Sequence, residues 1–192
     1  MIYFTSDLHL FHGNIITKFE FRPFKDIAEM NETIITNYNR VVTDTDDVYL
    51  LGDICFGRPQ DTIKILKSLK GRKYLIKGNH DKLNAEQKSC FMWIKDYYKL
   101  RVDGQKIILC HYPFYSWDGR DRKRDGVYRG SWHFHGHTHT NSHDDWQHPC
   151  KVNIGVDHWN YTPVSLDVLK QKIEANLKTA LVTPLASNQL KG

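Results

Sequence analysis

Aspartate, asparagine and histidine recur in five short clusters along the chain. The clusters are Asp7 with His9, Asp53, the run from Asn79 to Asp81, His111, and His137 with His139. Carboxylate, imidazole and amide groups together suit Mn²⁺, Fe²⁺, Zn²⁺ or Ni²⁺, whereas a cage of oxygens alone favours Ca²⁺ or Mg²⁺. The residue types therefore predict a site for transition-metal ions.

Two of the clusters have the same internal spacing. One residue separates Asp7 from His9, and one separates His137 from His139. Alternate side chains of an extended chain point the same way, so each pair is expected to face one ion from a strand that runs into its loop. A glycine precedes three of the clusters, where a tight turn or a close backbone approach is expected. These glycines are Gly52, Gly78 and Gly136.

Strands that end near these clusters are predicted to bring them together. Short β-rich runs predict strands over residues 2–5, 48–51, 74–76, 107–109 and 152–156. Helical patterns lie between several of them, which predicts an α/β sheet. Because ligands of such sheets gather beyond the carboxyl ends of the strands, the clusters are expected to meet at one edge.

Three helix starts are readable from local signals. Asp26 is a candidate N-cap for a helix whose apolar residues recur every three or four positions. Pro59 opens a second helix, for which Gly71 is the expected left-handed cap. A third helix is predicted to start at Asn84 and to bury Ile94.

The length and composition limit the class of protein. A chain of 192 residues fits one domain, predicted over residues 1–178, with a final helix at 166–177 and a peripheral tail at 179–192. No apolar run reaches the length of a membrane span, and no secretion signal is readable. Four widely spaced cysteines predict reduced thiols and a cytoplasmic protein. A net charge of +5 suits an anionic substrate but does not indicate nucleic acid.

The clusters resemble the motifs of the calcineurin-like metallophosphoesterase family, in its small bacterial or phage type. The family pattern is D-x-H, G-D, G-N-H-D or G-N-H-E, H, and G-H-x-H. The matching residues are Asp7-Leu8-His9, Gly52-Asp53, Gly78-Asn79-His80-Asp81, His111 and Gly136-His137-Thr138-His139. The resemblance covers most of the chain, and it implies a β-sandwich of two mixed sheets flanked by helices.

The resemblance also implies roles for individual residues. It implies two divalent ions, with manganese favoured over iron, zinc and nickel. One ion would bind Asp7, His9, Asp53 and His139, and the other Asp53, Asn79, His111 and His137, so that Asp53 bridges them. His80 would face the leaving-group oxygen as an acid or phosphate clamp, with Asp81 orienting its ring. Metal-bound histidines usually bond a carboxylate or carbonyl through their second nitrogen, and Asp157 is a candidate partner.

The predicted reaction is hydrolysis of a phosphate ester, most simply a phosphodiester. Two ions about 3.5 to 4 Å apart can acidify a bridging water, and the resulting hydroxide would attack phosphorus while His80 protonates the leaving oxygen. The diesterase prediction rests on a compact chain with little room for further substrate domains. Its substrate would be a small ester, a nucleotide or a nucleic acid, and no membrane is expected to be involved.

Two other functions stay open. One is a phosphomonoesterase acting on a nucleotide or another small ester. Protein phosphatases of this family carry Asp-Arg soon after G-D, whereas four residues separate Asp53 from Arg58 here. The other is an inactive metal-binding scaffold, which would be expected to lack some motif residues that are intact here.

Substrate contacts are predicted outside the five clusters. His12 lies just past the first cluster, and Arg122 and Arg124 offer guanidinium groups that suit a phosphate. The alternative for the two arginines is a solvated charged loop, and nearby aromatic residues such as Trp117 and Tyr128 are expected to anchor that loop.

Overall fold

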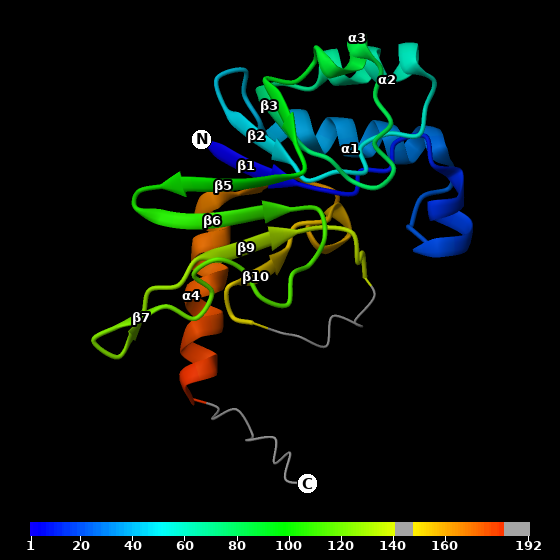
Figure 1. The fold of residues 1–192 in the computed structure, drawn as a ribbon. Helices are drawn as coiled ribbons and strands as arrows, with labels where there is room; N and C mark the ends of the chain where they lie inside the picture. Colours follow the sequence, from blue (N-terminus) through cyan, green and yellow to red (C-terminus); the bar gives the residue numbers. More distant parts are fainter. Residues whose placement is uncertain (141–147, 183–192) are drawn as a thin grey trace, which may run out of the picture.

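The computed structural model describes residues 1–140 and 148–182, which form two mixed sheets with helices on the outside (Figure 1). The first sheet has the strand order β11-β1-β2-β3-β4, and all neighbours are parallel except β11 and β1. Its strands are β1 (Ile2–Thr5), β2 (Asp47–Leu50), β3 (Arg72–Ile76), β4 (Trp93–Lys95) and β11 (Val164–Ser165).

The second sheet has the order β10-β9-β6-β5, in which only β5 runs antiparallel to its neighbour. Its strands are β5 (Tyr97–Val102), β6 (Gln105–Cys110), β9 (Trp132–His135) and β10 (Lys151–Asn153). A separate hairpin joins β7 (Lys123–Arg124) to β8 (Val127–Tyr128). The prediction of an α/β protein with two mixed sheets and flanking helices is confirmed.

Alternating side chains of the central strands form two cores. Phe4 and Tyr49 face the second sheet, where the ring of Phe4 meets the ring of Phe134 edge-on with centroids 5.0 Å apart. Their neighbours Tyr3 and Val48 face the opposite way and pack against the helices. Both faces of these strands are therefore buried, as expected for strands inside a layered α/β fold.

Helices flank the two sheets. They are α1 (Ile27–Val41), α2 (Pro59–Ser68), α3 (Ala85–Lys88) and α4 (Leu166–Val182), with a π-helical turn η1 (Ile15–Phe19) and a 3-10 turn η2 (Val156–His158). Side chains of α1 and α2 belong to the first core, and those of α4 belong to the core between the sheets. None of the helices in the described ranges combines the length and apolarity needed to cross a membrane.

The signals for helix starts act as predicted, whereas the helix-end signal at Gly71 does not. The Asp26 side chain accepts a hydrogen bond from Glu29 N at 2.9 Å, and Pro59 opens α2. The prediction for Gly71 is wrong, because α2 ends at Ser68 and is followed by extended backbone. Gly71 has φ +81° in the turn into β3, packed against the Asp46 carbonyl.

The third and last helices differ in length from the prediction. Asn84 and Gln87 form a complete capping box, yet α3 ends at Lys88 and Ile94 belongs to β4. Parallel pairing with β3 prevails there over continuation of the helix. Helix α4 continues to Val182, so residues 179–182 are helical, and residues 183–192 of the expected tail lie outside the described residues.

Candidate metal centre

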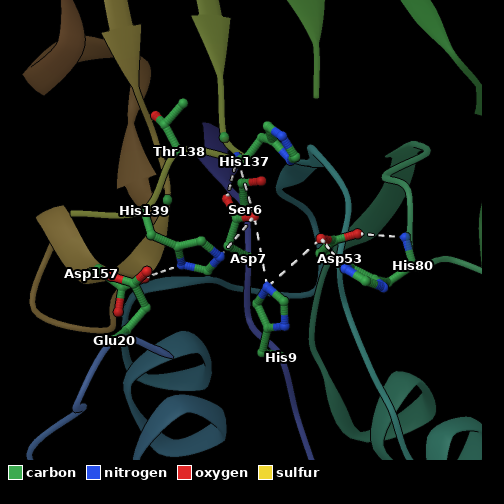
Figure 2. A network of polar contacts seen from close by, with 12 residues as sticks. Ser6, Asp7, His9, Glu20, Asp53, His80, His137, Thr138, His139 and Asp157 are labelled. Carbon is green, nitrogen blue, oxygen red and sulfur yellow. Dashed lines mark hydrogen bonds and ion pairs between the residues drawn. The ribbon is translucent and has the colours of Figure 1, made fainter. Parts of the chain in front are cut away.

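The five clusters meet beyond the carboxyl ends of the parallel strands. Figure 2 shows residues of four of them, and His111, the fifth, lies in a donor group with Asp7 and Asp53. Asp7 follows β1, Asp53 follows β2 and His80 follows β3, while His111 and His137 follow β6 and β9 of the other sheet. The site therefore lies where the two sheets come together, at the edge that the position of the clusters predicted.

The backbone that presents these side chains is not extended. Asp7, His9 and Asp53 have φ values of 56°, 50° and 53°, and His137 and His139 have 69° and 46°. Extended alternation is therefore the wrong explanation for the two paired motifs. Left-handed backbone at non-glycine residues costs about 1 to 3 kcal/mol each and is found where a functional site requires it.

Hydrogen bonds between neighbouring loops hold this strained backbone. Asp7 N donates to Gly52 O at 3.0 Å, and His9 N donates to Asp53 O at 3.0 Å. Gly52 has φ +92°, and a Cβ there would lie 2.5 Å from Gly78 N. Only glycine allows the loops after β2 and β3 to come this close.

Two groups of donor atoms lie close enough to bind ions. Asp7, His9 and His139 form one group, and Asp7, Asp53 and His111 form the other, with donor atoms within 4.8 Å of one another in each. Asp7 belongs to both groups. Asp53 Oδ2 lies 3.7 Å from His9 Nε2 and 3.6 Å from His111 Nε2, between the histidines of the two groups.

The donor set is suited to a cation. His111 Nδ1 lies 2.7 Å from Leu51 O, and in the tautomer that donates this bond Nε2 presents a lone pair. That lone pair faces two further acceptors, Asn79 Oδ1 at 3.0 Å and Asp53 Oδ2 at 3.6 Å. An ion bound among these three atoms would replace repulsion between acceptors with coordination.

His9 supplies a second sign that the residues fit metal ions. Its Nε2 is buried and has no hydrogen-bond partner among the described residues. Burial lowers the pKa of His9 far below its ordinary value, which keeps the ring neutral, and burial raises the pKa of the Asp7 carboxyl. A buried imidazole lone pair beside buried carboxylates is expected where a divalent cation binds.

His137 occupies a different position from the other candidate ligands. Its ring lies edge-on to that of His111 with centroids 5.1 Å apart, and it belongs to neither donor group. Its backbone N–H donates to both oxygens of Asp7, at 3.2 and 3.0 Å. Ligation through the ring of His137 stays a prediction.

Two residues outside the motifs support the first donor group. His139 Nδ1 lies 3.0 Å from Asp157 Oδ2, the partner considered from the sequence (Figure 2). Burial opposes protonation of the ring, but the bond to Asp157 and the charge of Asp7 outweigh it and raise the pKa of His139.

Arg22, which no sequence motif indicates, completes this support. Arg22 donates to both Asp157 oxygens, at 2.8 and 2.9 Å, and to the Asp7 carbonyl at 2.7 Å. Burial would raise the pKa of the Asp157 carboxyl, but His139 and Arg22 lower it, so this buried residue remains ionised. No motif connects Arg22 to Asp157, because 135 positions separate them.

His80 and Asp81 are adjacent in the chain, but their side chains make different contacts. His80 N donates to Asp53 Oδ1 at 2.9 Å, while its ring, 49% exposed, places Nε2 4.0 Å from Asp53 Oδ2. The Asp81 carboxylate instead accepts from the backbone N–H groups of Asp53, Ile54 and Gly78, at 2.9, 3.0 and 2.8 Å. The structure thus corrects the expectation that Asp81 orients the His80 ring, because its carboxylate ties the loops together.

The residues predicted to contact substrate lie in two different parts of the structure. His12 lies at the site, with its Nδ1 3.2 Å from His9 Nδ1. Arg122 and Arg124 are on the β7–β8 hairpin, which extends from the end of the sheet opposite the arrowheads of β6 and β9 (Figure 1). The chain returns along the sheet after His111 before forming this hairpin, so the structure does not bring the two arginines to the metal centre, and their contact with substrate stays a prediction.

Comparison with known proteins supports the motif-based assignment. The profile of the calcineurin-like phosphoesterase superfamily domain matches residues 1–168. An uncharacterised protein of Methanocaldococcus jannaschii is 36% identical over 90% of this chain and 91% of its own. The gene 66 protein of Mycobacterium phage D29 is 31% identical over 90% of this chain and 95% of its own.

A solved structure extends the likeness to the whole fold. A protein of unknown function from Aquifex aeolicus has a TM-score of 0.70 and 29% identity, covering 89% of this chain and 98% of that one. The matched family profile includes all five clusters and the strands that carry them. The chain belongs to the calcineurin-like phosphoesterase superfamily, a family of hydrolases that act on phosphate esters and use divalent metal ions.

Proposed function

We propose that this protein is a phosphodiesterase that binds two divalent transition-metal ions, with Mn²⁺ as the preferred ion. The observation that carries the proposal is the pair of donor groups that share Asp7 and have Asp53 Oδ2 between their histidines. We assign Asp7, His9, Asp53 and His139 to one ion. We assign the other ion to Asp53, Asn79, His111 and His137.

The bound ions would supply an activated water as nucleophile and would neutralise charge on the phosphoryl oxygens. The protein's own residues perform the remaining tasks. His80 is placed to protonate the leaving oxygen, since its ring is half exposed and borders Asp53. Positioned acids of this kind contribute about 10²- to 10⁴-fold to the rate. The three amide bonds to Asp81 keep the backbone of this loop in place.

A diester is favoured over a monoester by the distribution of arginine side chains. A monoester dianion carries more charge than a diester and gains more from further guanidinium groups. Arg58 pairs with Asp61 at 2.8 Å and its side chain is 82% exposed. Arg122 and Arg124 lie on the distant hairpin. In the structure, these three arginines therefore do not form that clamp.

The test is hydrolysis of a generic phosphodiester and its monoester counterpart, with Mn²⁺ or with a chelator. We expect Mn²⁺-dependent diester turnover that falls by about 10²-fold or more in His80→Ala and is lost in Asp53→Asn. Arg124→Ala, a charge removal on the hairpin, is the matched control and should retain activity. A preference for the monoester would establish the alternative activity. Inactivity of a protein shown to bind two ions would indicate a scaffold.

A further inference from the structure

Aromatic side chains lie beside His80. The Phe56 ring has its centroid 5.0 Å from that of His80 and 5.1 Å from that of His9. Phe56 is 37% exposed although it borders a largely buried centre. An exposed aromatic ring next to the reacting groups is available to contact whatever is esterified to the phosphate.

His12 and Phe19 extend this aromatic surface. The ring of His12 lies flat against Phe56, with centroids 4.1 Å apart and planes inclined by 12°. The ring centroid of Phe19 lies 5.8 Å from that of His12, and Phe19 is 61% exposed. We call His12, Phe19 and Phe56 the aromatic rim. The rings of His12 and Phe56 stack on each other, and the Phe19 ring is tilted by 37° to that of His12. The parts of these rings that stay exposed offer aromatic surface onto which another flat ring can stack.

The chain that carries the rim has unusual local geometry. Phe19 ends the π-helical turn η1. Such turns are rare in proteins, but those that occur are often found at functional sites. Phe21 follows with φ 49° and 72% exposure. The exposed large hydrophobic residues within 10–26 and 54–58 are all phenylalanines, and the next one along the chain is Ile27, at 37% exposure.

We propose that the aromatic rim is the subsite for the base of a nucleoside whose 5′-oxygen is the leaving group. This inference rests on the proposed phosphodiesterase activity, since it places the leaving oxygen beside His80. Phe56 is next to His80, so a group attached to that oxygen reaches the rim first. Stacking on aromatic side chains accepts any base because every base has a flat face.

The reaction at this subsite consumes one water. The bond between phosphorus and the nucleoside 5′-oxygen breaks, and that oxygen takes a proton. A new bond forms between phosphorus and the oxygen of the water. The products from a methyl ester of adenosine 5′-phosphate are therefore adenosine and methyl phosphate. Release of methanol would mean that the nucleoside occupies the other side of the phosphate.

The experiment compares that ester with its abasic analogue, the methyl ester of 1-deoxyribose 5-phosphate, in the Mn²⁺-loaded protein. Both have the same type of leaving oxygen, so the ratio of their kcat/KM values isolates the contribution of the base. We expect a ratio of about 5- to 100-fold in the wild type, the range typical of base stacking. In Phe56→Leu, which keeps apolar volume but removes the ring, the ratio should fall toward one.

Tyr115→Ala is the matched control, because Tyr115 is 63% exposed and its ring lies beside Arg120 instead of His80. It should retain the wild-type ratio. Three results would overturn the proposal. They are a wild-type ratio near one, faster hydrolysis of a methyl octyl phosphate diester than of the adenosine ester, and release of methanol from the adenosine ester.

A binding measurement separates this inference from the proposed function. If neither ester is hydrolysed, the proposed function fails and the rim is tested with 2-aminopurine riboside 5′-monophosphate in the presence of chelator. Fluorescence quenching by the wild type that is weakened in Phe56→Leu would support the subsite. Absence of quenching by the wild type would overturn it.

Discussion

The segment from His133 to His139 has a histidine at every second position, and its two halves lie in different environments. On β9, His133 is fully buried, with Nδ1 3.1 Å from Ile108 O and Nε2 3.0 Å from Phe114 N. Beyond the strand, His139 has Nδ1 3.0 Å from Asp157 Oδ2, while Nε2 points toward Asp7 Oδ1 at 3.9 Å.

The difference lies in how many ring nitrogens the protein itself satisfies. Backbone groups satisfy both nitrogens of His133, and burial lowers its pKa to about 3, so its ring is a neutral part of the core. One nitrogen of His139 is left facing a carboxylate. Identical residues at identical spacing thus serve packing in one half, while in the other half they lie at the candidate metal centre.

The sharpest test of this contrast is His139→Ala. We expect loss of Mn²⁺ from the first donor group and a decrease in diester kcat/KM of about 10³-fold or more, since a metal ion supplies several kcal/mol of transition-state stabilisation. Calorimetric Mn²⁺ titration and the diester assay measure the two effects. Unchanged metal stoichiometry would remove His139 from the ligand set.

His133→Ala should have the opposite profile. Removing the ring leaves a buried N–H and a buried carbonyl without their partner and opens a cavity, so the free energy of unfolding should fall by about 2 to 4 kcal/mol. Denaturant unfolding of the metal-free protein gives this value. The folded variant should still bind Mn²⁺ with wild-type stoichiometry, and loss of binding would mean that His133 acts at the centre.

Asp157→Asn weakens the support of His139 without removing a ligand. Loss of a carboxylate partner behind a metal-bound histidine typically costs about 10- to 100-fold in metal affinity. We expect that decrease in a Mn²⁺ titration, together with retained folding by circular dichroism. An unchanged affinity would show that the pairing of Arg22, Asp157 and His139 only organises the fold.

The buried neutral ring of His133 should make the folded protein less stable in acid. Its folded pKa of about 3 lies below the ordinary value of 6.5, so the unfolded chain binds the proton first as pH falls. Stability should therefore decrease from about pH 6.5 toward pH 3, at up to about 1.4 kcal/mol per pH unit. Denaturant midpoints of the metal-free protein should show a shallower decrease in His133→Gln, and an identical slope would contradict this.

The smallest effect is expected on the distant hairpin. Arg122→Ala combined with Arg124→Ala should change diester kcat/KM by less than about two-fold, because exposed charges on this hairpin act only through screened long-range fields. Steady-state kinetics at moderate salt measure it. A decrease beyond ten-fold would return the two arginines to substrate binding.

Local sequence signals predicted where helices start better than where they end. Asp26 and Pro59 start their helices as expected, because caps depend on neighbouring residues. Gly71 and Ile94 were misplaced, since strand pairing with β2 and β3 decides the backbone there. The meeting of the five clusters was predictable because each follows a strand, and the carboxyl ends of parallel strands meet at one edge.

The sequence by itself determined the order of the motifs and the donor types, because these depend on residues close together in the chain. Only the tertiary structure decided that Arg22 holds Asp157, that Asp81 binds three backbone amides and that Phe56 borders His80. It also decided that the arginine hairpin extends away from the site. Contacts between distant segments depend on how sheets and loops pack, and no local pattern encodes that packing.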